Sequence, residues 1–299
     1  DLLVGEQCGY AVTAVTGEGE KTVQNNPWDT GTGGTPACCY PTLEAQDAFS
    51  TCVVGRPYIE AGTMHTATVR RGRGWARGRR PDVTGLSGAE RAVLAAAWTE
   101  DALVEHASVA AFARTTLELL AVGAPAELIA GAQAAASDEV RHAQLSFALA
   151  EAYAGHPVAA GPFPLGPQLT LETDLARIAA ATFREGCVGE TVVAMLSARA
   201  AALATDPAAR ALLSVVARDE ARHAELAWRT LAWAVDAGGA SVRAAVEAEV
   251  EGLLQRGIRL TQVTSGASDT ALSAHGRIRL AEAERTRNEA CFEVILPCV

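Results

Sequence analysis

The strings SDEVRHA (residues 137–143) and RDEARHA (residues 218–224) write Asp-Glu-x-Arg-His twice, 81 positions apart. In a helix, residues three apart lie on one face, so each string places a Glu beside a His. A carboxylate and an imidazole together can ligate one metal ion. Two copies on two helices therefore predict two ions, each held by one Glu and one His. These four residues are Glu139, His142, Glu220 and His223.

The sequence around the two strings predicts four long helices. From Ser87 onward the composition shifts to Ala, Leu, Glu and Arg, and apolar residues recur at helical spacing. Ser87 and Glu90 form a capping box, and Asp206-Pro207 supplies an N-cap followed by proline at the first helical position. Glycine and proline end or separate the periodic stretches. The expected helices cover about 87–122, 126–153, 173–204 and 206–235.

Two further acids lie in the middle of the first and third expected helices. Glu105 shares its face with apolar residues that include Trp98 and Phe112, and Glu190 shares its face with Phe183. A carboxylate among apolar residues is costly to bury unless it pairs or binds a metal. A bridged two-metal site needs such additional carboxylates. The complete order is Glu105, Glu139-x-x-His142, Glu190 and Glu220-x-x-His223.

This order of six ligands resembles the ferritin-like di-iron carboxylate superfamily, which includes bacterioferritin, rubrerythrin, and bacterial di-iron monooxygenases and desaturases. The resemblance covers about residues 88–236 and implies an all-α core in the form of a ferritin-like four-helix bundle. It implies two iron ions as the cofactor, with manganese as the alternative. Glu139 and Glu220 would bridge the two ions, whereas Glu105 and Glu190 would bind more terminally.

The resemblance also implies roles for the charged residues inside the two strings. Asp138 and Asp219 are expected to accept a hydrogen bond from a ligating histidine, which fixes its tautomer and raises its basicity. Each Asp would serve the histidine of the other string. Arg141 and Arg222 are expected to pair with these acids and to offset negative charge. The alternative is that all four are ordinary exposed charges on a helix surface.

Two residues near the ligands are candidates for lining a substrate pocket. Cys187 lies one turn before Glu190, and Ser108 lies one turn after the ligand of the first helix. The alternatives are a small buried core residue for Cys187 and small-residue packing for Ser108. Gly186 and Gly189 flank Cys187 and permit either a local bulge in the helix or a close approach of another helix.

The two flanks of the expected bundle have a different character. Residues 1–86 are rich in Gly, Pro, Thr and Cys and are expected to be irregular, whereas 87–236 form the bundle. Residues 237–299 are expected to hold two weaker helices, at about 240–260 and 277–290, and a cysteine-bearing tail. Six of the seven cysteines lie in these flanks: Cys8, Cys38, Cys39, Cys52, Cys291 and Cys298.

An even number of cysteines in loop-rich flanks is typical of a disulfide framework in an exported protein. Six reduced thiols in a cytosolic protein are the alternative, and a zinc site is disfavoured because no C-x-x-C spacing occurs. The chain starts at Asp1 with neither Met nor a signal peptide, which suggests a processed mature form or a trimmed sequence. We therefore expect an extracellular or periplasmic protein whose signal peptide has been removed.

Composition limits the partners. Hydrophobic residues make up 49% of 299 residues, which is enough for a sizeable core, and no run of about 20 apolar residues indicates a membrane span. The net charge of −10 disfavours nucleic acids and anionic membranes because its field repels both. Small molecules and metal cations are the expected partners, and a homo-oligomer is compatible with the composition.

An arginine-rich stretch, residues 69–80, is the exception to this acidic character. It carries six arginines around Trp75, and the remainder of the chain has a net charge of −16. The stretch is therefore expected to dock against the acidic bundle of its own chain, with a solvated loop as the alternative.

The leading functional hypothesis is an oxidase or oxygenase that activates dioxygen to act on a small organic substrate, with electrons from a donor. About 86 residues before the helices and about 60 after them exceed what a cage ferritin carries, and they are enough to cap a pocket or to form a partner surface. Three alternatives remain: a ferroxidase or iron-handling protein, a dimanganese catalase-like peroxide scavenger, and a structural or assembly protein whose metal only clamps the helices. An oxygenase needs an apolar cavity beside the metals, a ferroxidase needs an acidic iron path, and a clamp needs neither.

Overall fold

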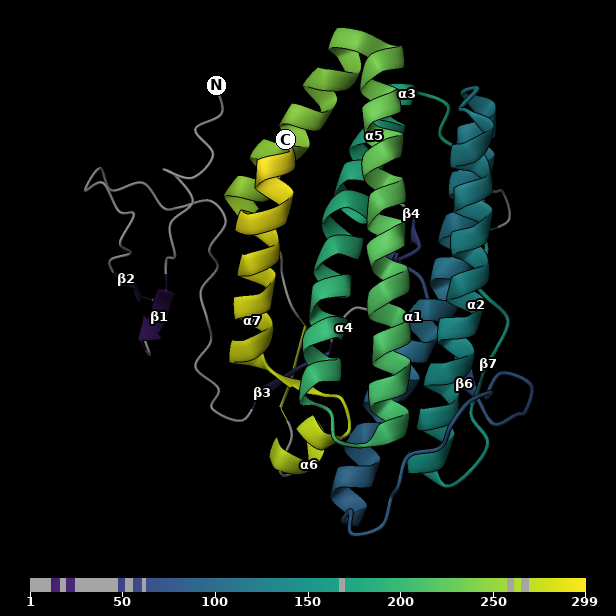
Figure 1. Ribbon diagram of the computed structural model, residues 1–299, viewed down its shortest axis with the longest axis vertical. Helices are drawn as coiled ribbons and strands as arrows, with labels where there is room; N and C mark the ends of the chain where they lie inside the picture. The colour runs from purple at the N-terminus through teal and green to yellow at the C-terminus, as the bar shows by residue number, and fades with distance from the viewer. Residues whose placement is uncertain are drawn as a thin grey trace.

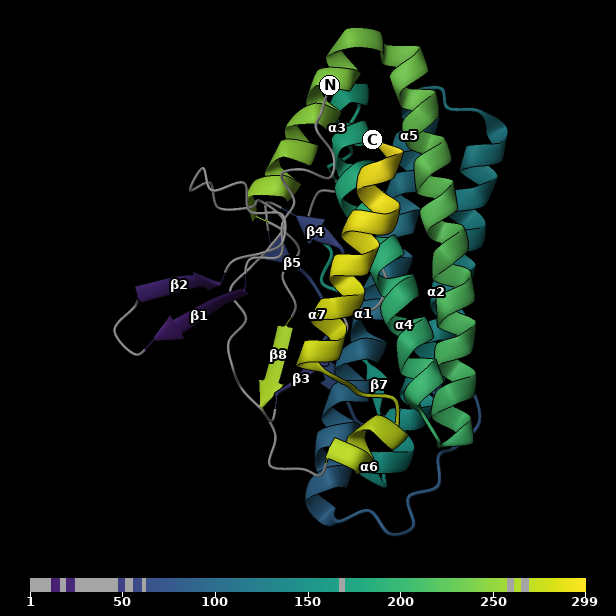
Figure 2. The ribbon, with the colours of Figure 1, turned by 60° about the vertical axis from the view of Figure 1, so that its left-hand side comes forward.

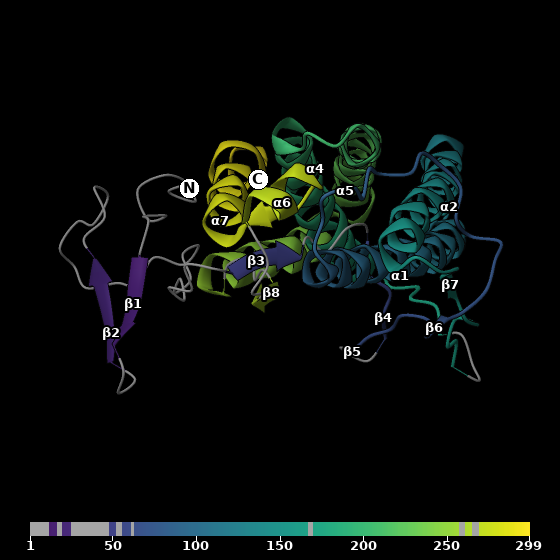
Figure 3. The same cartoon turned by 90° about the horizontal axis from the view of Figure 1, so that it is seen from below.

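Long helices packed side by side dominate the computed structural model (Figure 1). The predicted helical bundle is confirmed. Seen from below, the helices follow one another from α7 through α4 and α5 to α1 and α2 (Figure 3). The structure describes residues 12–16, 20–24, 48–51, 56–60, 63–166, 170–256, 261–264 and 269–299.

The first two helices form an antiparallel pair. Helix α1 (Gly88–Ala121) begins at the predicted capping box, in which the Ser87 backbone donates to Glu90 Oε2 over 2.8 Å and the Glu90 backbone donates to Ser87 Oγ over 3.2 Å. A short turn follows, in which Gly123 has a φ of 72°. Helix α2 (Ala126–Ala154) begins after Pro125 and ends at Gly155.

The third long helix is composite. It consists of α3 (Leu175–Ala181), the π-helix η1 (Thr182–Glu190) and α4 (Thr191–Leu203). The bulge expected near Gly186 occurs, because this glycine lies in the π-helix. The expected close approach of another helix occurs too, since a Cβ on Gly186 would lie 2.5 Å from Ala227 Cβ and 2.4 Å from Arg56 Nη2. The wide turn of the π-helix changes the register in which the following residues meet the core.

Helix α5 (Pro207–Arg256) consists of two helical segments that meet at Gly239. Its start is capped by Asp206, whose Oδ1 accepts hydrogen bonds from the backbones of Ala208 and Ala209 over 2.9 and 2.8 Å. Gly239 has φ 60° and ψ −136°, which ends the regular helix. Figure 1 shows the resulting bend in α5. The break lies where the sequence predicts the end of the fourth helix.

The C-terminal part packs along α4. Helix α7 (Leu280–Glu289) runs beside α4 (Figure 2), and the chain continues as a π-turn over Ala290–Ile295 and a 3-10 turn over Leu296–Cys298. Helix α6 (Asp269–Ala274) precedes it. Arg277, between α6 and α7, donates to Asp101 Oδ2 over 2.7 Å, and its guanidinium lies 3.9 Å from the centroid of the Trp98 ring. This buried pair ties the C-terminal part to α1.

The described strands are short and form small antiparallel ladders at the side of the helices (Figure 2). Strand β3 lies between β8 and β9, so it joins the N-terminal and C-terminal flanks. The paired strands are β1 (Val12–Thr16) with β2 (Glu20–Gln24), β3 (Ala48–Thr51) with β8 (Thr261–Thr264) and β9 (Ile278–Arg279), β4 (Ile59–Glu60) with β5 (Thr63–Met64), and β6 (Val69–Arg70) with β7 (Ala159–Ala160).

The cysteines are described only in part. Cys187 and Cys291 are buried, Cys298 is exposed, and the three carry no disulfide among the described residues. The other four cysteines of the expected disulfide framework, Cys8, Cys38, Cys39 and Cys52, lie outside the described residues.

In the described part of the chain, one stretch, Leu175–Leu203, is long and apolar enough to cross a membrane by length and composition, with a mean hydropathy of 1.3. From the sequence alone we expected no segment that meets these criteria. Most of its apolar window, 67%, is buried inside the bundle. Because core helices of soluble proteins pass the same test, the stretch is weak evidence for a span.

The arginine-rich stretch docks on the α1–α2 pair mainly through its tryptophan. The Trp75 ring lies edge-on to His106, with centroids 4.7 Å apart, and 6.0 Å from the centroid of Phe147. The backbone of Arg77 donates to the Gln144 carbonyl over 3.0 Å. Apolar and backbone contacts thus hold the stretch against the helices.

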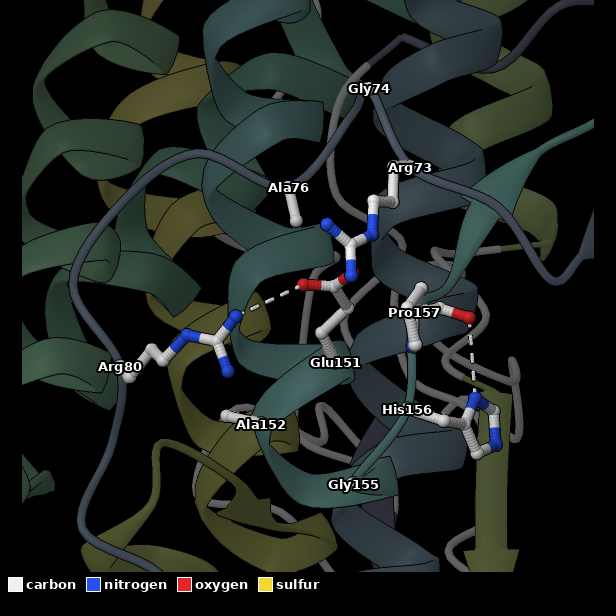
Figure 4. Close-up of a pocket in the computed structure, with 9 residues that line it drawn as sticks. All are labelled: Arg73, Gly74, Ala76, Arg80, Glu151, Ala152, Gly155, His156 and Pro157. Atoms are coloured by element: carbon white, nitrogen blue, oxygen red, sulfur yellow. Dashed lines mark hydrogen bonds and ion pairs between the residues drawn. The ribbon is translucent and has the colours of Figure 1, made fainter.

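The arginine side chains of this stretch mostly face solvent. Arg80 pairs with Glu151 over 3.3 Å, and Arg70 donates to the Ala160 carbonyl over 2.9 Å. Figure 4 shows the pair of Arg80 and Glu151 in a pocket between the stretch and the end of α2, which Arg73 also lines. This pocket contains none of the six predicted metal ligands, so the candidate site lies elsewhere.

Candidate metal centre

The six predicted ligands meet inside the bundle. Each side chain is almost completely buried, with at most 4% of the residue exposed. Helix α1 carries Glu105, α2 carries Glu139 and His142, η1 ends at Glu190, and α5 carries Glu220 and His223. The ligand atoms form two groups, and within each group all of them lie within 4.8 Å of one another. The first group contains Glu105, Glu139, His142 and Glu220, and the second contains Glu190, Glu220 and His223.

The Nδ1 atoms of the two histidines face the carboxylates. Nδ1 of His142 lies 3.6 Å from Glu139 Oε2 and 3.4 Å from Glu220 Oε1. Nδ1 of His223 lies 3.1 Å from Glu139 Oε1 and 3.5 Å from Glu220 Oε2. Glu139 and Glu220 therefore each direct one oxygen toward His142 and the other toward His223, which is the arrangement that a bridging carboxylate needs.

The two remaining carboxylates each belong to one half. Glu105 Oε2 lies 3.7 Å from His142 Nδ1, and Glu190 is grouped with Glu220 and His223. These positions suit ligands of a single ion.

The cluster leaves many buried polar atoms without hydrogen bonds. Among the described residues, all eight oxygens of the four carboxylates and the Nδ1 atoms of both histidines have no hydrogen-bond partner of good geometry. A buried polar atom without a partner costs free energy, and four neighbouring carboxylates also repel one another. Bound cations would satisfy these atoms and neutralise their charge, so the residues fit a pair of divalent metal ions.

Without metal, the carboxylates divide into two kinds. Burial and then the charge of Glu139 raise the pKa of Glu105 well above its usual range, and burial and then the charge of Glu220 raise that of Glu190 in the same way. Burial also opposes ionisation of Glu139 and Glu220. Their contacts with the two imidazoles, and that of Glu220 with Glu190, outweigh burial and lower the pKa of both. The two carboxylates placed to bridge are thus the pair whose surroundings favour ionisation.

The surroundings of both histidines favour the protonated imidazole in the metal-free cluster. Burial lowers the pKa of His142, but contacts with Asp219 and Glu105 raise it well above the usual value. The same balance, with Glu139 and Glu220 as the acids, raises the pKa of His223 to about 9. The added protons occupy the Nδ1 positions that a metal ion requires.

An aspartate lies behind each histidine. The Nε2 atom of His142 lies 3.1 Å from Asp219 Oδ2, and that of His223 lies 3.4 Å from Asp138 Oδ2. Each histidine therefore meets the Asp of the other string. An acceptor at Nε2 keeps a proton on that atom, so loss of the Nδ1 proton would leave the Nδ1 lone pair free for a metal ion.

Two arginines close a ring of ion pairs around these aspartates. Arg222 donates to Asp219 Oδ1 over 2.7 Å and to Asp138 Oδ2 over 2.9 Å. Arg141 donates to Asp138 Oδ1 over 3.0 Å and also to Asp219. Burial alone would raise the pKa of Asp219, but His142, Arg222 and Arg141 hold it below its usual range. The ring joins α2 to α5 on the outer side of the cluster.

Replacing Asp219 by asparagine is expected to weaken metal binding by about 10- to 100-fold, because the His142 ring loses the anion that orients it. Asp138→Asn should have a smaller effect, since the Asp138 side chain is 21% exposed and its contact with histidine is longer. Competition titrations of Mn²⁺ against a chelating dye measure both affinities. The control is Asp236→Asn, an exposed acid on α5. Equal affinities in Asp219→Asn and the control would contradict the orienting role.

Ser108 and Cys187, the two candidates for lining a substrate pocket, lie in the packed interior of the bundle. Ser108 is buried, and its hydroxyl donates to the Val104 carbonyl over 3.1 Å within α1. Cys187 lies in the main apolar core, where burial raises the pKa of its thiol. Neither lines the pocket of about 500 Å³ that adjoins the cluster near Arg56.

Arg56 is a contact that sequence reasoning missed. It precedes β4, only 5% of it is exposed, and its Nε atom lies 3.8 Å from Glu190 Oε1. Its guanidinium lies 4.9 Å from the centroid of Phe112, and its Nη1 donates to Thr115 Oγ1 over 3.0 Å. Arg56 stands outside every periodic stretch, so the only signal was indirect: a cluster with four carboxylates and two imidazoles favours a nearby cation.

The chain thus presents a helical bundle with buried carboxylates and imidazoles in its interior. Their separation, orientation and lack of hydrogen-bond partners suit metal ions. The chain matches no protein-family model, no curated protein and no solved structure. The geometry alone shows a helical bundle whose buried cluster of Glu and His can hold metal ions.

Proposed function

We propose that this chain is a ferritin-like di-iron carboxylate protein that activates dioxygen for the oxidation of a small organic substrate. The observation that carries the proposal is the convergence of four buried carboxylates and two imidazole Nδ1 atoms that lack hydrogen-bond partners among the described residues. Such a donor set suits iron, with manganese as the alternative.

The protein's own residues set up the site. Glu139 and Glu220 offer one oxygen to each half, and Asp219 and Asp138 keep the histidine protons on Nε2. When bound, a pair of ferrous ions supplies two electrons for the reduction of dioxygen. Burial of every ligand excludes bulk water from the cluster, so its charges act in a medium of low dielectric constant.

The pocket beside the cluster is large enough for a small-molecule substrate, although eight charged residues give it a mixed lining and not the apolar one expected of an oxygenase. Its volume is about 500 Å³, within the range of small-molecule sites. Four arginines and four glutamates line it, so it lacks the excess of acids that an iron path needs. A purely structural clamp needs no pocket. The charged residues are Arg56, Arg114, Arg177 and Arg184 together with Glu60, Glu118, Glu172 and Glu185.

The cellular setting forms part of the same proposal. The flank cysteines favour an exported protein. Dioxygen, a small organic molecule and an electron donor would be its partners.

Metal analysis of the purified protein, followed by rapid mixing of the ferrous form with dioxygen, tests the proposal. We expect two iron ions per chain and a change in visible absorbance within the first seconds after mixing. Glu220→Gln protein, treated identically, is the control and should show no such change. Protein that takes up no iron, or ferrous protein that remains unchanged in oxygen, would overturn the proposed activity. A bound manganese pair that decomposes peroxide would favour the catalase-like alternative.

A further inference from the structure

Arg56 separates the metal cluster from the adjoining pocket. On one side its Nε atom faces Glu190 Oε1 at 3.8 Å, and on the other the residue forms part of the pocket lining. Its position is held by Phe112, which lies under the guanidinium, and by the hydroxyl of Thr115. Gly186 leaves the space that Arg56 Nη2 occupies, because a Cβ there would lie 2.4 Å from this atom.

The other arginines of the pocket already have carboxylate partners. Arg114 lies 3.9 Å from Glu118 and 4.0 Å from Glu185. Arg177 lies 3.5 Å from Glu172. Arg184 pairs with Glu249 over 2.7 Å and lies 3.6 Å from Glu185. These pairs balance the charge at the rim of the pocket.

Arg56 differs because its carboxylate partner among the described residues is a predicted metal ligand. Its Nε atom is also buried without a hydrogen-bond partner in the described part of the chain. Two divalent ions would neutralise the four carboxylates of the cluster, including Glu190. The remaining carboxylate near Arg56 would be Glu118, which already pairs with Arg114, and an incompletely paired buried guanidinium is a costly state.

We propose that the metal-loaded protein binds a small organic carboxylate in this pocket, with the carboxylate paired to Arg56. A guanidinium presents parallel N–H donors that match the two oxygens of a carboxylate. Ile59, Leu171, Ile178 and Ala181 supply apolar wall for the body of such a molecule. The proposal names the substrate class of the proposed function and rests on its metal centre, but it does not depend on the reaction with oxygen.

Calorimetric titration of benzoate into Mn²⁺-loaded protein tests this inference without any turnover. We expect benzoate to bind and benzamide, its neutral counterpart, to bind at least about 10-fold more weakly, because a charged hydrogen-bonded pair is lost. Arg56→Gln should weaken benzoate binding by about 10- to 100-fold. Arg285→Gln is the matched control, since Arg285 lies on α7 outside the pocket, is exposed and pairs with Glu282. It should bind benzoate like the unaltered protein.

Arg56→Lys guards against a folding defect in Arg56→Gln. It keeps the positive charge but loses the planar fork, so we expect benzoate binding several-fold weaker than in the unaltered protein, with the Mn²⁺ content and melting temperature retained. Benzoate that binds Arg56→Gln or Arg56→Lys as tightly as the unaltered protein would overturn the proposal, because the carboxylate would then bind elsewhere, for example on the metal. Equal affinity for benzoate and benzamide would overturn it as well. Arg56-dependent benzoate binding by a protein whose ferrous form is inert to oxygen would refute the proposed activity alone.

Discussion

Glu220→Gln protein is expected to lose both metal ions. Glu220 is the residue common to both groups of ligand atoms, and its two oxygens lie 3.4 Å from His142 Nδ1 and 3.5 Å from His223 Nδ1. Glutamine keeps the shape of the side chain but removes its negative charge and replaces one oxygen by an N–H donor. We expect metal affinity to fall by at least about 100-fold, more than for loss of an orienting residue. Metal content after dialysis and dye-competition titration measure the change.

Two further variants define the specificity of this effect. Glu225→Gln alters an exposed acid on the same helix and should retain both ions. Glu105→Gln alters a carboxylate that faces His142 in the first group only, so it should mainly weaken the first ion. If Glu220→Gln retained two ions per chain, the assignment of Glu220 as a bridging ligand would be wrong.

Metal binding is expected to stabilise the protein more strongly as the pH rises from about 6.5 toward 9. His223 has a folded-state pKa of about 9, and contacts with Asp219 and Glu105 also raise the pKa of His142. An ion must displace these protons, so its affinity should increase about tenfold per pH unit for each proton released.

The stability of the metal-free protein should fall as the pH rises over the same window. A raised folded-state pKa contributes stability that is complete below the unfolded value, about 6.5 for histidine, and that is lost as the pH rises through the folded value. Glu139 and Glu220, whose pKa values are lowered, stay ionised throughout this window, whereas Glu105 and Glu190, whose pKa values are raised, change stability in the same direction as the histidines. The chelated protein should therefore lose stability with rising pH while the Mn²⁺-loaded protein gains affinity.

Melting temperatures of Mn²⁺-loaded and chelated protein across this pH range measure the gap between them. At a free metal concentration 100-fold above its dissociation constant, each ion adds about 2.7 kcal/mol to the free energy of unfolding. Glu220→Gln protein serves as the control and should show no metal-dependent gap at any pH. A gap that stays constant or narrows as the pH rises would mean that metal binding releases no protons from the histidines.

Much of the helical core follows from local sequence. The capping box at Ser87, the Asp206 cap and the break at Gly239 each depend on residues close together in the chain. These interactions form wherever the helix lies, so periodicity and caps predict the helix ends within a few residues. The spacing of Glu139 with His142 is equally local, because three positions always bring two side chains to one helix face.

Other features depend on how distant segments pack. Arg56 reaches Glu190 from a segment without helical periodicity, and the pocket beside it combines residues of α1, α3, η1 and β4. No spacing in the sequence predicts such meetings, because they depend on the path of the whole chain. For the arginine-rich stretch, the sequence predicts the docking but not the kind of contact, because Trp75 rather than charge provides most of it.

The sequence by itself determined the helices and the order of the six candidate ligands, since both are written in short-range patterns of apolar and charged residues. The tertiary structure decided which carboxylate oxygens face which imidazole, that a π-helix ends at Glu190, and that a buried arginine lies between the cluster and a pocket. The physical reason is the distance along the chain between the residues that interact. A helix is stabilised by hydrogen bonds and side-chain contacts between residues about four positions apart, whereas the site forms only when helices far apart in the chain pack together.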